Sequence, residues 1–180
     1  MRVITGTARG RRLKEPSDMR VRPTTEMVKE AVFNIIQFQI EGAKVLDLFA
    51  GTGQLGIEAL SRGAAEAVFV DSSNDSLKLV RENLKITGLE ERARVVRADA
   101  LSYIKNGEKY DIVFLDPPYD EDLLEKSVSA SVMFDILRGN GIIICESRGG
   151  KALPEPNRDG LLKREYRYGK IKLTVYRKDG

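Results

Sequence analysis

The feature that most constrains the fold is a regular alternation of short apolar runs with segments of helical spacing. Apolar runs typical of buried strands occur at 45–49, 67–70, 94–98, 110–115 and 141–146. Between them, apolar residues recur every three or four positions, as on one face of a helix. Strands that alternate with helices in this way predict an α/β domain with a largely parallel sheet.

The two ends of the chain modify this pattern. Residues 161–167 and 170–177 flank Gly169 and alternate like a terminal hairpin, which predicts an antiparallel edge. The helices are expected to begin after Thr24-Thr25, at Leu55, at a cap on Asn74 or Asp75, and at Asp120, the last continuing to Leu137.

Composition excludes several classes of protein. The 180 residues suggest one domain, and no apolar run approaches the roughly 20 residues of a membrane-spanning helix. The chain has no histidine and one cysteine, Cys145, so it has no His-based catalysis and no Cys-x-x-Cys metal site. The first residues lack the apolar region of a signal peptide, and we therefore expect a cytoplasmic protein.

Charge is concentrated at the N-terminus. Residues 1–22 hold seven basic residues against two acids, a net charge of +5, so the rest of the chain sums to −2. Such a segment is typical of a protein with a phosphate-rich partner, although a solvated terminus would have the same composition. We expect residues 1–22 to form a basic hairpin arm and residues 23–180 to form one folding unit.

Carboxylates follow four successive predicted strands. They are Asp47, Asp71, Asp99 and Asp116. Ligands of open α/β sheets bind at the carboxyl ends of the strands, so these side chains are expected to line one site. Any one of them alone could be a solvated loop residue or a helix cap.

A glycine-rich turn follows the first strand of the core. Residues 51–56 read Gly-Thr-Gly-Gln-Leu-Gly, and Asp71 stands twenty positions after Gly51. This is the pattern of a dinucleotide-binding turn, in which the acid accepts hydrogen bonds from a ribose. The pattern alone fits any cofactor with a nucleoside, including a nicotinamide or a flavin.

The acids favour a cationic cofactor over a pyrophosphate. Asp47 and Asp116 would repel the phosphates of a dinucleotide, whereas the sulfonium and amino groups of S-adenosylmethionine are positive. Asp99-Ala100 then fits the adenine, because the carboxylate can accept from its amine and the alanine can pack on its ring. The sequence therefore predicts an S-adenosylmethionine site without a metal.

The most specific short motif is Asp116-Pro117-Pro118-Tyr119. Prolines fix the turn, and a carboxylate, a carbonyl and an aromatic ring together suit a planar amine attached to a ring. The motif resembles the signature of methyltransferases that act on exocyclic amines of nucleobases. The turn Phe49-Ala50-Gly51-Thr52-Gly53 is similar to their S-adenosylmethionine loop.

The resemblance extends over nearly the whole chain to one family, the RsmD small-subunit ribosomal RNA guanine-N2 methyltransferases. It includes the opening at 2–6, the arm at 10–13, the motif at 22–34, the helix at 56–63 and the late strand ending in Glu146. The sequence departs from the family pattern at Met27, Lys29 and Gln54, where we expect other residues, and Tyr119 stands where some relatives carry phenylalanine.

The resemblance implies a Rossmann-like class I methyltransferase fold, with a mostly parallel seven-stranded sheet and an antiparallel C-terminal edge. It implies methyl transfer from S-adenosylmethionine to guanine N2 in 16S rRNA, within an assembling small subunit and without a membrane or an obligate protein partner. The implied catalytic residues are Asp116, Pro117, Pro118 and Tyr119. The implied cofactor-binding residues are Asp47, Phe49, Ala50, Gly51, Gly53, Asp71, Ser72, Asp99 and Ala100. The implied RNA-binding residues are Arg9, Arg11, Arg12, Lys14, Arg20, Arg22 and Thr24.

Other functions remain open on the motifs alone. The Asp116 motif also fits a methyltransferase acting on adenine N6 in DNA, although the chain has no separate target-recognition domain. A non-catalytic nucleic-acid-binding protein on the same scaffold and a nicotinamide oxidoreductase are further alternatives. A cytosine-C5 methyltransferase is disfavoured, because it needs a thiol nucleophile and Cys145 lies in a predicted strand away from the motif.

Overall fold

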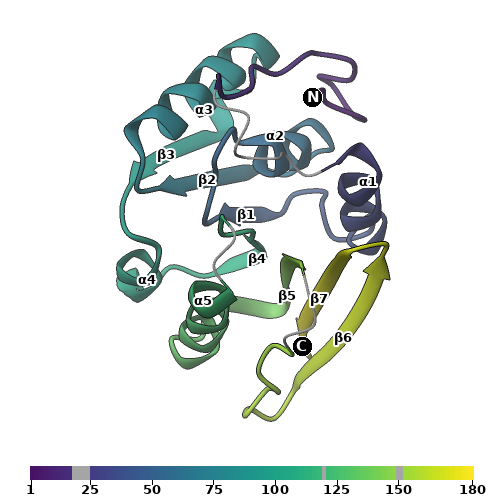
Figure 1. The fold of residues 1–180 in the computed structure, drawn as a ribbon, viewed down its shortest axis with the longest axis vertical. Coiled ribbons are helices and arrows are strands. Elements are labelled where there is room, and N and C mark those ends of the chain that lie inside the picture. The colour runs from purple at the N-terminus through teal and green to yellow at the C-terminus, as the bar shows by residue number, and fades with distance from the viewer. Residues whose placement is uncertain (18–24, 119–120, 149–151) are drawn as a thin grey trace.

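A seven-stranded sheet forms the centre of the computed structural model, which describes residues 1–17, 25–118, 121–148 and 152–180 (Figure 1). The strand order is β3-β2-β1-β4-β5-β7-β6. Strands β1 to β5 pair in parallel, and β7 pairs antiparallel with both β5 and β6. The strands are β1 (Lys44–Asp47), β2 (Glu66–Asp71), β3 (Ala93–Arg97), β4 (Tyr110–Leu115), β5 (Leu137–Arg148), β6 (Leu161–Tyr168) and β7 (Ile171–Lys178).

Helices cover both faces of this sheet. They are α1 (Glu26–Ile35), α2 (Gln54–Ser61), α3 (Asn74–Thr87), α4 (Ala100–Tyr103) and α5 (Glu121–Met133), with short 3-10 turns η1 (Glu90–Arg92) and η2 (Ile104–Asn106). Successive strand residues point to opposite faces, so Val45 joins the core under α1, α2 and α3, whereas Leu46 joins the core under α4 and α5. Among the described residues, no helix has the length and apolar composition needed to span a membrane.

The predicted sheet, mostly parallel with an antiparallel C-terminal edge, is confirmed. Strand β1 lies between β2 and β4. From β1 the chain adds β2 and β3 on one side of it and then returns to add β4 and β5 on the other, so the order in which strands are added reverses at β1. A crevice opens at such a reversal, outside the carboxyl ends of the strands. The topology therefore sets where a ligand can bind.

Two predicted helix boundaries are wrong. The helix expected to reach Leu137 ends at Met133, because Asp135 takes a left-handed conformation (φ 49°) and Leu137 already begins β5. The helix expected to be capped by Asn74 or Asp75 is capped by Ser73, whose hydroxyl accepts the Ser76 amide at 3.3 Å. The predicted hydroxyl cap of α1 is Thr25.

The N-terminal segment (residues 1–17) lies against the helical layer of α2 and α3. Its one β-bridge joins Arg2 to Arg12, with Val3 and Arg11 also hydrogen-bonded through their backbones. Val3, Ala8 and Leu13 are buried in the same core as α1 and α2. Gly6 approaches so closely that an added Cβ would meet the Ser61 carbonyl oxygen at 1.8 Å. These contacts make the described part of the predicted arm continuous with the core of the domain.

Glu58 on α2 holds this segment in place. Its fully buried carboxylate accepts the amides of Ile4 and Thr5 at 2.8 and 2.9 Å. It also pairs with buried Lys29 at 3.4 Å and with Arg62 at 2.8 Å. Lys29 in turn donates to the Arg2 carbonyl oxygen. One acid therefore connects the N-terminal segment to α1 and α2.

Replacing this acid should destabilise the protein strongly. We expect Glu58→Ala to lower the free energy of unfolding by about 3–5 kcal/mol, because it leaves a buried cation and two amides without their acceptor. The matched control is Glu66→Ala, whose side chain is 43% exposed and pairs with Lys44. That control should lose less than about 1 kcal/mol. Urea denaturation measures both, and equal losses would contradict the role of Glu58.

Candidate functional site

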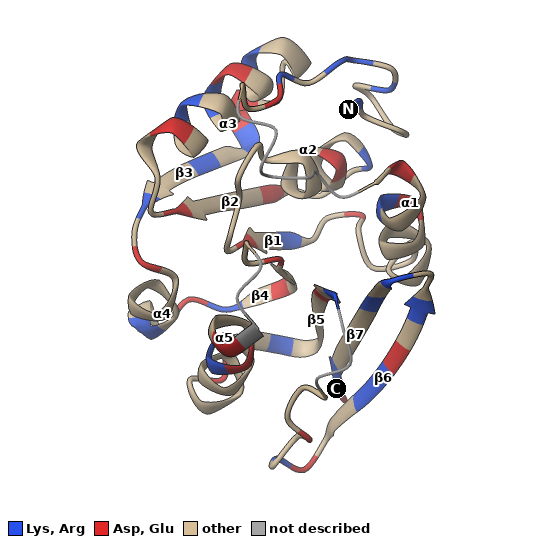
Figure 2. Cartoon of the chain, in the orientation of Figure 1, with Lys and Arg blue, Asp and Glu red and all other residues tan. Residues whose placement is uncertain are grey.

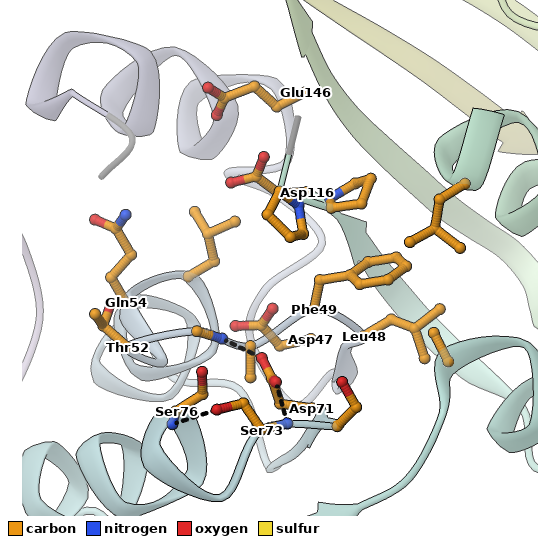
Figure 3. Close-up of a pocket in the computed structure, with 18 of the residues that line it drawn as sticks. Asp47, Leu48, Phe49, Thr52, Gln54, Asp71, Ser73, Ser76, Asp116 and Glu146 are labelled. Carbon is orange, nitrogen blue, oxygen red and sulfur yellow. Dashed lines mark hydrogen bonds between the residues drawn. The ribbon is translucent and has the colours of Figure 1, made fainter. Parts of the chain in front are cut away.

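A cavity of about 620 Å³ opens at the carboxyl ends of the parallel strands. This volume is in the range of pockets that hold a small organic ligand. Five aspartates line it, and four of them stand at strand ends: Asp47 ends β1, Asp71 ends β2, Asp99 follows β3, and Asp116 directly follows β4. The fifth, Asp75, lies in the first turn of α3. In Figure 3, Asp71 lies at one end of the pocket, Asp116 and Glu146 at the other, and Asp47 between them.

Glycines set the path of the chain beneath the pocket. Gly53 takes a left-handed conformation (φ 80°) at the N-cap of α2, where an L side chain would be strained. Gly56 packs against β2 so closely that a Cβ would lie 2.3 Å from the Phe69 ring. The Gly56 amide donates to Asp47 Oδ2 at 3.1 Å. The helix start and the acid at the end of β1 are therefore fixed against each other.

Asp71 is oriented by two backbone amides. Its Oδ2 accepts from Gly51 at 3.0 Å and its Oδ1 accepts from Ser73 at 2.8 Å (Figure 3). A carboxylate has about four lone-pair sites, so two remain for a ligand. The geometry suits a group with two adjacent hydroxyls.

Burial changes the acidity of Asp47. The residue is 2% exposed, and burial raises its pKa to about 8, with smaller contributions in the same direction from the Asp116 and Asp71 carboxylates. The Gly56 amide acts in the opposite direction. A positive ligand group beside Asp47 would restore the charged form, since an opposite charge stabilises a carboxylate. The centre of the pocket thus favours a cation.

The titration of Asp47 should be visible in the stability of the protein without ligand. Because the folded-state pKa (about 8) exceeds the ordinary value of 3.8, the folded state binds the extra proton, and stability falls as pH rises from about 4 to 8. We expect the wild type to lose at least about 1.4 kcal/mol relative to Asp47→Asn between pH 5.5 and 7.5. Urea denaturation of both proteins measures this, and parallel pH profiles would contradict it.

The other predicted pocket residues have these positions. Phe49, Ala50, Gly51, Ser72 and Ala100 line the pocket, and Gly53 lies beneath it as the N-cap of α2. Asp99 is exposed and caps α4 by accepting the Ser102 amide at 2.9 Å. Pro117 is buried and Pro118 exposed, both on the pocket wall. Tyr119 lies outside the described residues.

Sequence reasoning missed several residues that line the pocket. Pro16 comes from the N-terminal segment, Leu79 from α3, and Arg148 from the end of β5. Gln54, noted only as a departure from the family pattern, also lines the pocket, and its Oε1 is buried without a hydrogen-bond partner among the described residues. No local pattern marks Pro16, because its position depends on contacts far along the chain.

The predicted RNA-binding residues divide into three groups. Arg9, Arg11 and Arg12 are exposed, whereas Lys14 pairs with Glu82 at 2.9 Å. Arg20, Arg22 and Thr24 lie outside the described residues. Lys29, which stands where the family pattern has another residue, is buried against Glu58 and therefore faces neither the pocket nor a partner.

Asn83 connects the N-terminal segment to the glycine turn. This buried side chain accepts the Lys14 amide at 2.7 Å and donates to the carbonyl oxygens of Lys14 and Thr52 at 3.1 and 2.9 Å. Thr52 and Pro16 both line the pocket. The segment expected to contact RNA is thus linked through Asn83 to the turn expected to contact the cofactor.

Other chemistry has little support in the described part of the chain. No cluster of three or more possible metal ligands occurs among these residues. Cys145 is fully buried in β5, and burial raises the pKa of its thiol above the ordinary value. A buried thiol with a raised pKa is a poor nucleophile.

Comparison with known proteins assigns the chain to a family. The family described as conserved hypothetical protein 95 matches residues 1–177. YlbH of Bacillus subtilis is 39% identical over the full length of both chains. Ribosomal RNA small subunit methyltransferase D of Escherichia coli is 36% identical over 99% of this chain and 90% of its own.

Solved structures agree with these sequence matches. The structure of yhhF from Escherichia coli is 35% identical, covers 99% of this chain and 98% of its own, and superposes with a TM-score of 0.88. HI0767 from Haemophilus influenzae is 31% identical with a TM-score of 0.82, covering 99% and 98% of the two chains. The resemblance that the sequence motifs indicate is therefore confirmed, and the chain belongs to the conserved hypothetical protein 95 family, which it shares with RsmD-like relatives.

Proposed function

We propose that this protein transfers the methyl group of S-adenosylmethionine to the exocyclic N2 amine of a guanine in 16S rRNA. The observation that carries the proposal is the order of groups along the pocket. A two-acceptor carboxylate at Asp71, a buried acid at Asp47 and the Asp116-Pro117-Pro118 turn follow one another (Figure 3). The small-subunit rRNA methyltransferases among the relatives support rRNA as the substrate and the cytoplasm as the location.

The donor set fits S-adenosylmethionine. Asp71 has acceptors left for ribose hydroxyls, and Asp99 with buried Ala100 would take the adenine. Asp47 has a pKa of about 8 that a cationic ligand would lower, which suits an ammonium or sulfonium, and the neighbouring Asp71 and Asp116 carboxylates disfavour a pyrophosphate. When bound, the cofactor supplies an electrophilic methyl group on a positively charged sulfur.

The chain's own residues would position the amine. The Asp116 carboxylate and the Pro117 carbonyl would accept its two hydrogens and aim the nitrogen lone pair at the methyl carbon. Held by Asp71, Asp47 and Asp99, the cofactor would supply the methyl carbon to the nitrogen and keep the electron pair of the carbon–sulfur bond, and the nitrogen would release one proton to water. Asp116 stabilises the positive charge that develops on the nitrogen, so positioning and electrostatics supply the rate. Tyr119 is the ring that we expect to stack on the looped-out base.

Exposed arginines of the N-terminal segment would contact the RNA backbone. Arg9, Arg11 and Arg12 have no ion pair among the described residues, so their charges remain available to phosphates. Lys14 contributes less in this proposal, because it already pairs with Glu82.

Cofactor affinity tests the role of Asp71. We expect Asp71→Asn to raise the dissociation constant for S-adenosylmethionine at least tenfold, because hydrogen bonds to a charged group are worth about 1.5–3 kcal/mol. The control is Glu66→Gln, an equal charge change at the other end of β2. Calorimetric titration measures both. Unchanged affinity in Asp71→Asn would remove the residue from the site, and tighter binding of NAD than of S-adenosylmethionine would favour an oxidoreductase.

Turnover tests the role of Asp116. We expect Asp116→Ala to abolish methyl transfer while S-adenosylmethionine affinity stays within a few fold, because the carboxylate acts on the target amine and its loss appears in kcat. Single-turnover transfer to small ribosomal subunits from cells lacking the enzyme measures the first quantity. Activity above about a tenth of the wild-type value would contradict the assignment.

A further inference from the structure

The C-terminal hairpin β6–β7 is the most basic stretch of the described chain. Residues 161–178 hold seven Lys and Arg against one acid, a net charge of +6, whereas residues 23–160 sum to −7. Figure 2 shows these cations along both strands of the hairpin. The net charge of +3 for the whole chain does not reveal this positive hairpin, because the acidic residues elsewhere offset it.

Only some of these cations are neutralised within the protein. Lys163 and Lys172 pair with Glu165, and Lys178 pairs with Asp135. Arg164, Arg167 and Lys170 are exposed and have no ion pair among the described residues. Their charges therefore face solvent.

Strand register places the turn of this hairpin at the pocket. Arg148 at the end of β5 pairs with Ile171, and Ser147 pairs with Lys172. Glu146, Ser147 and Arg148 line the cavity, and Figure 3 shows Glu146 at the end occupied by Asp116. Gly169 and Lys170 join β6 to β7, so they lie directly beside this part of the pocket wall. We call the Asp116 end of the pocket its target end. Arg167 lies two positions before Gly169, in the last part of β6.

The acidic residues around the pocket would repel a polyanion such as RNA. Asp47, Asp71, Asp99, Asp116 and Glu146 surround the cavity, and RNA carries a negative charge on every nucleotide. Cations at the rim lower the electrostatic cost of bringing phosphates to that mouth. Charged residues also protect edge strands such as β6 from pairing with other chains, but that protection does not require cations at the turn.

We infer that the β6–β7 turn is an RNA-contacting surface at the target end of the pocket, with Arg167 and Lys170 bound to backbone phosphates next to the methylated guanine. This inference rests on the proposed function, because it assumes that the target is RNA. The turn belongs to strands β7 and β6, which form one end of the sheet. The N-terminal segment packs elsewhere, on α2 and α3, so the turn would add a second RNA contact.

Salt-dependent binding tests the surface. The variant is Arg167→Gln/Lys170→Gln, and the probe is the small ribosomal subunit from cells lacking the enzyme. We expect affinity at 0.15 M salt to fall roughly tenfold and the slope of log affinity against log salt to become less steep by about 1.4, for two lost contacts on single-stranded RNA. S-adenosylmethionine affinity should equal that of the wild type, which also shows that the variant is folded.

Two matched variants separate charge from position. Lys85→Gln/Lys105→Gln removes two exposed cations from α3 and η2 and should leave binding and slope unchanged. Arg167→Lys/Lys170→Arg keeps the charge at the turn and should retain most of the affinity. If the wild type methylates subunits but the turn variant behaves like the α3/η2 control, the inference is wrong and the proposed function stands. If the wild type neither binds nor methylates subunits, both fall.

Discussion

The Gly56 amide donates a buried hydrogen bond to the Asp47 carboxylate, and this bond joins the end of β1 to the first turn of α2. It forms only because Gly56 lets α2 approach Phe69, where a Cβ would have no room. The same contact keeps an acid in a place where burial disfavours its charge. The protein thus holds at its centre a carboxyl group whose charged form is disfavoured by burial and stabilised by one backbone amide. The neighbouring acids Asp116 and Asp71 raise the pKa of Asp47 further, because their negative charges disfavour its ionised form.

Charge is divided between the scaffold and its flanks. The parallel-sheet body is acidic, and both basic stretches lie at the chain ends, one packed on α2 and α3 and one forming the far edge of the sheet. A cationic small molecule and an anionic polymer have opposite electrostatic requirements. Under the proposed function, the separation of acids and bases along the chain would let one domain meet both requirements with Arg148 as the one cation on the pocket wall among the described residues.

The core of the fold was predictable because its signals are local. Apolar runs, glycine turns and strand-ending acids each occupy a few adjacent residues, and parallel pairing then brings Asp47, Asp71 and Asp116 together. The predicted helix ends were wrong where a single residue sets the end of the helix, as at Asp135, which has a left-handed backbone conformation. The part played by Glu58 and Asn83 could not be read from the sequence, because, apart from Arg62 beside Glu58, their side-chain partners lie 29 to 69 positions away and follow no period. Pro16 likewise reaches the pocket only through the folded chain. The raised pKa of Asp47 likewise depends on burial by distant strands.

The contacts of the N-terminal segment also set an order for folding during synthesis. Thr7 and Ala8 bind Ser61, and Lys14 binds Asn83, so each of these contacts spans more than 50 residues. Residues 1–17 precede α2 and α3 in the chain, so they cannot reach their native positions until those helices have also emerged from the ribosome. Closing so long a loop is costly until the partners that reward it are in place. The native contacts of residues 1–17 therefore become available only after α2 and α3 have been synthesised, and Asn83 can link the glycine turn to Lys14 only from that stage on.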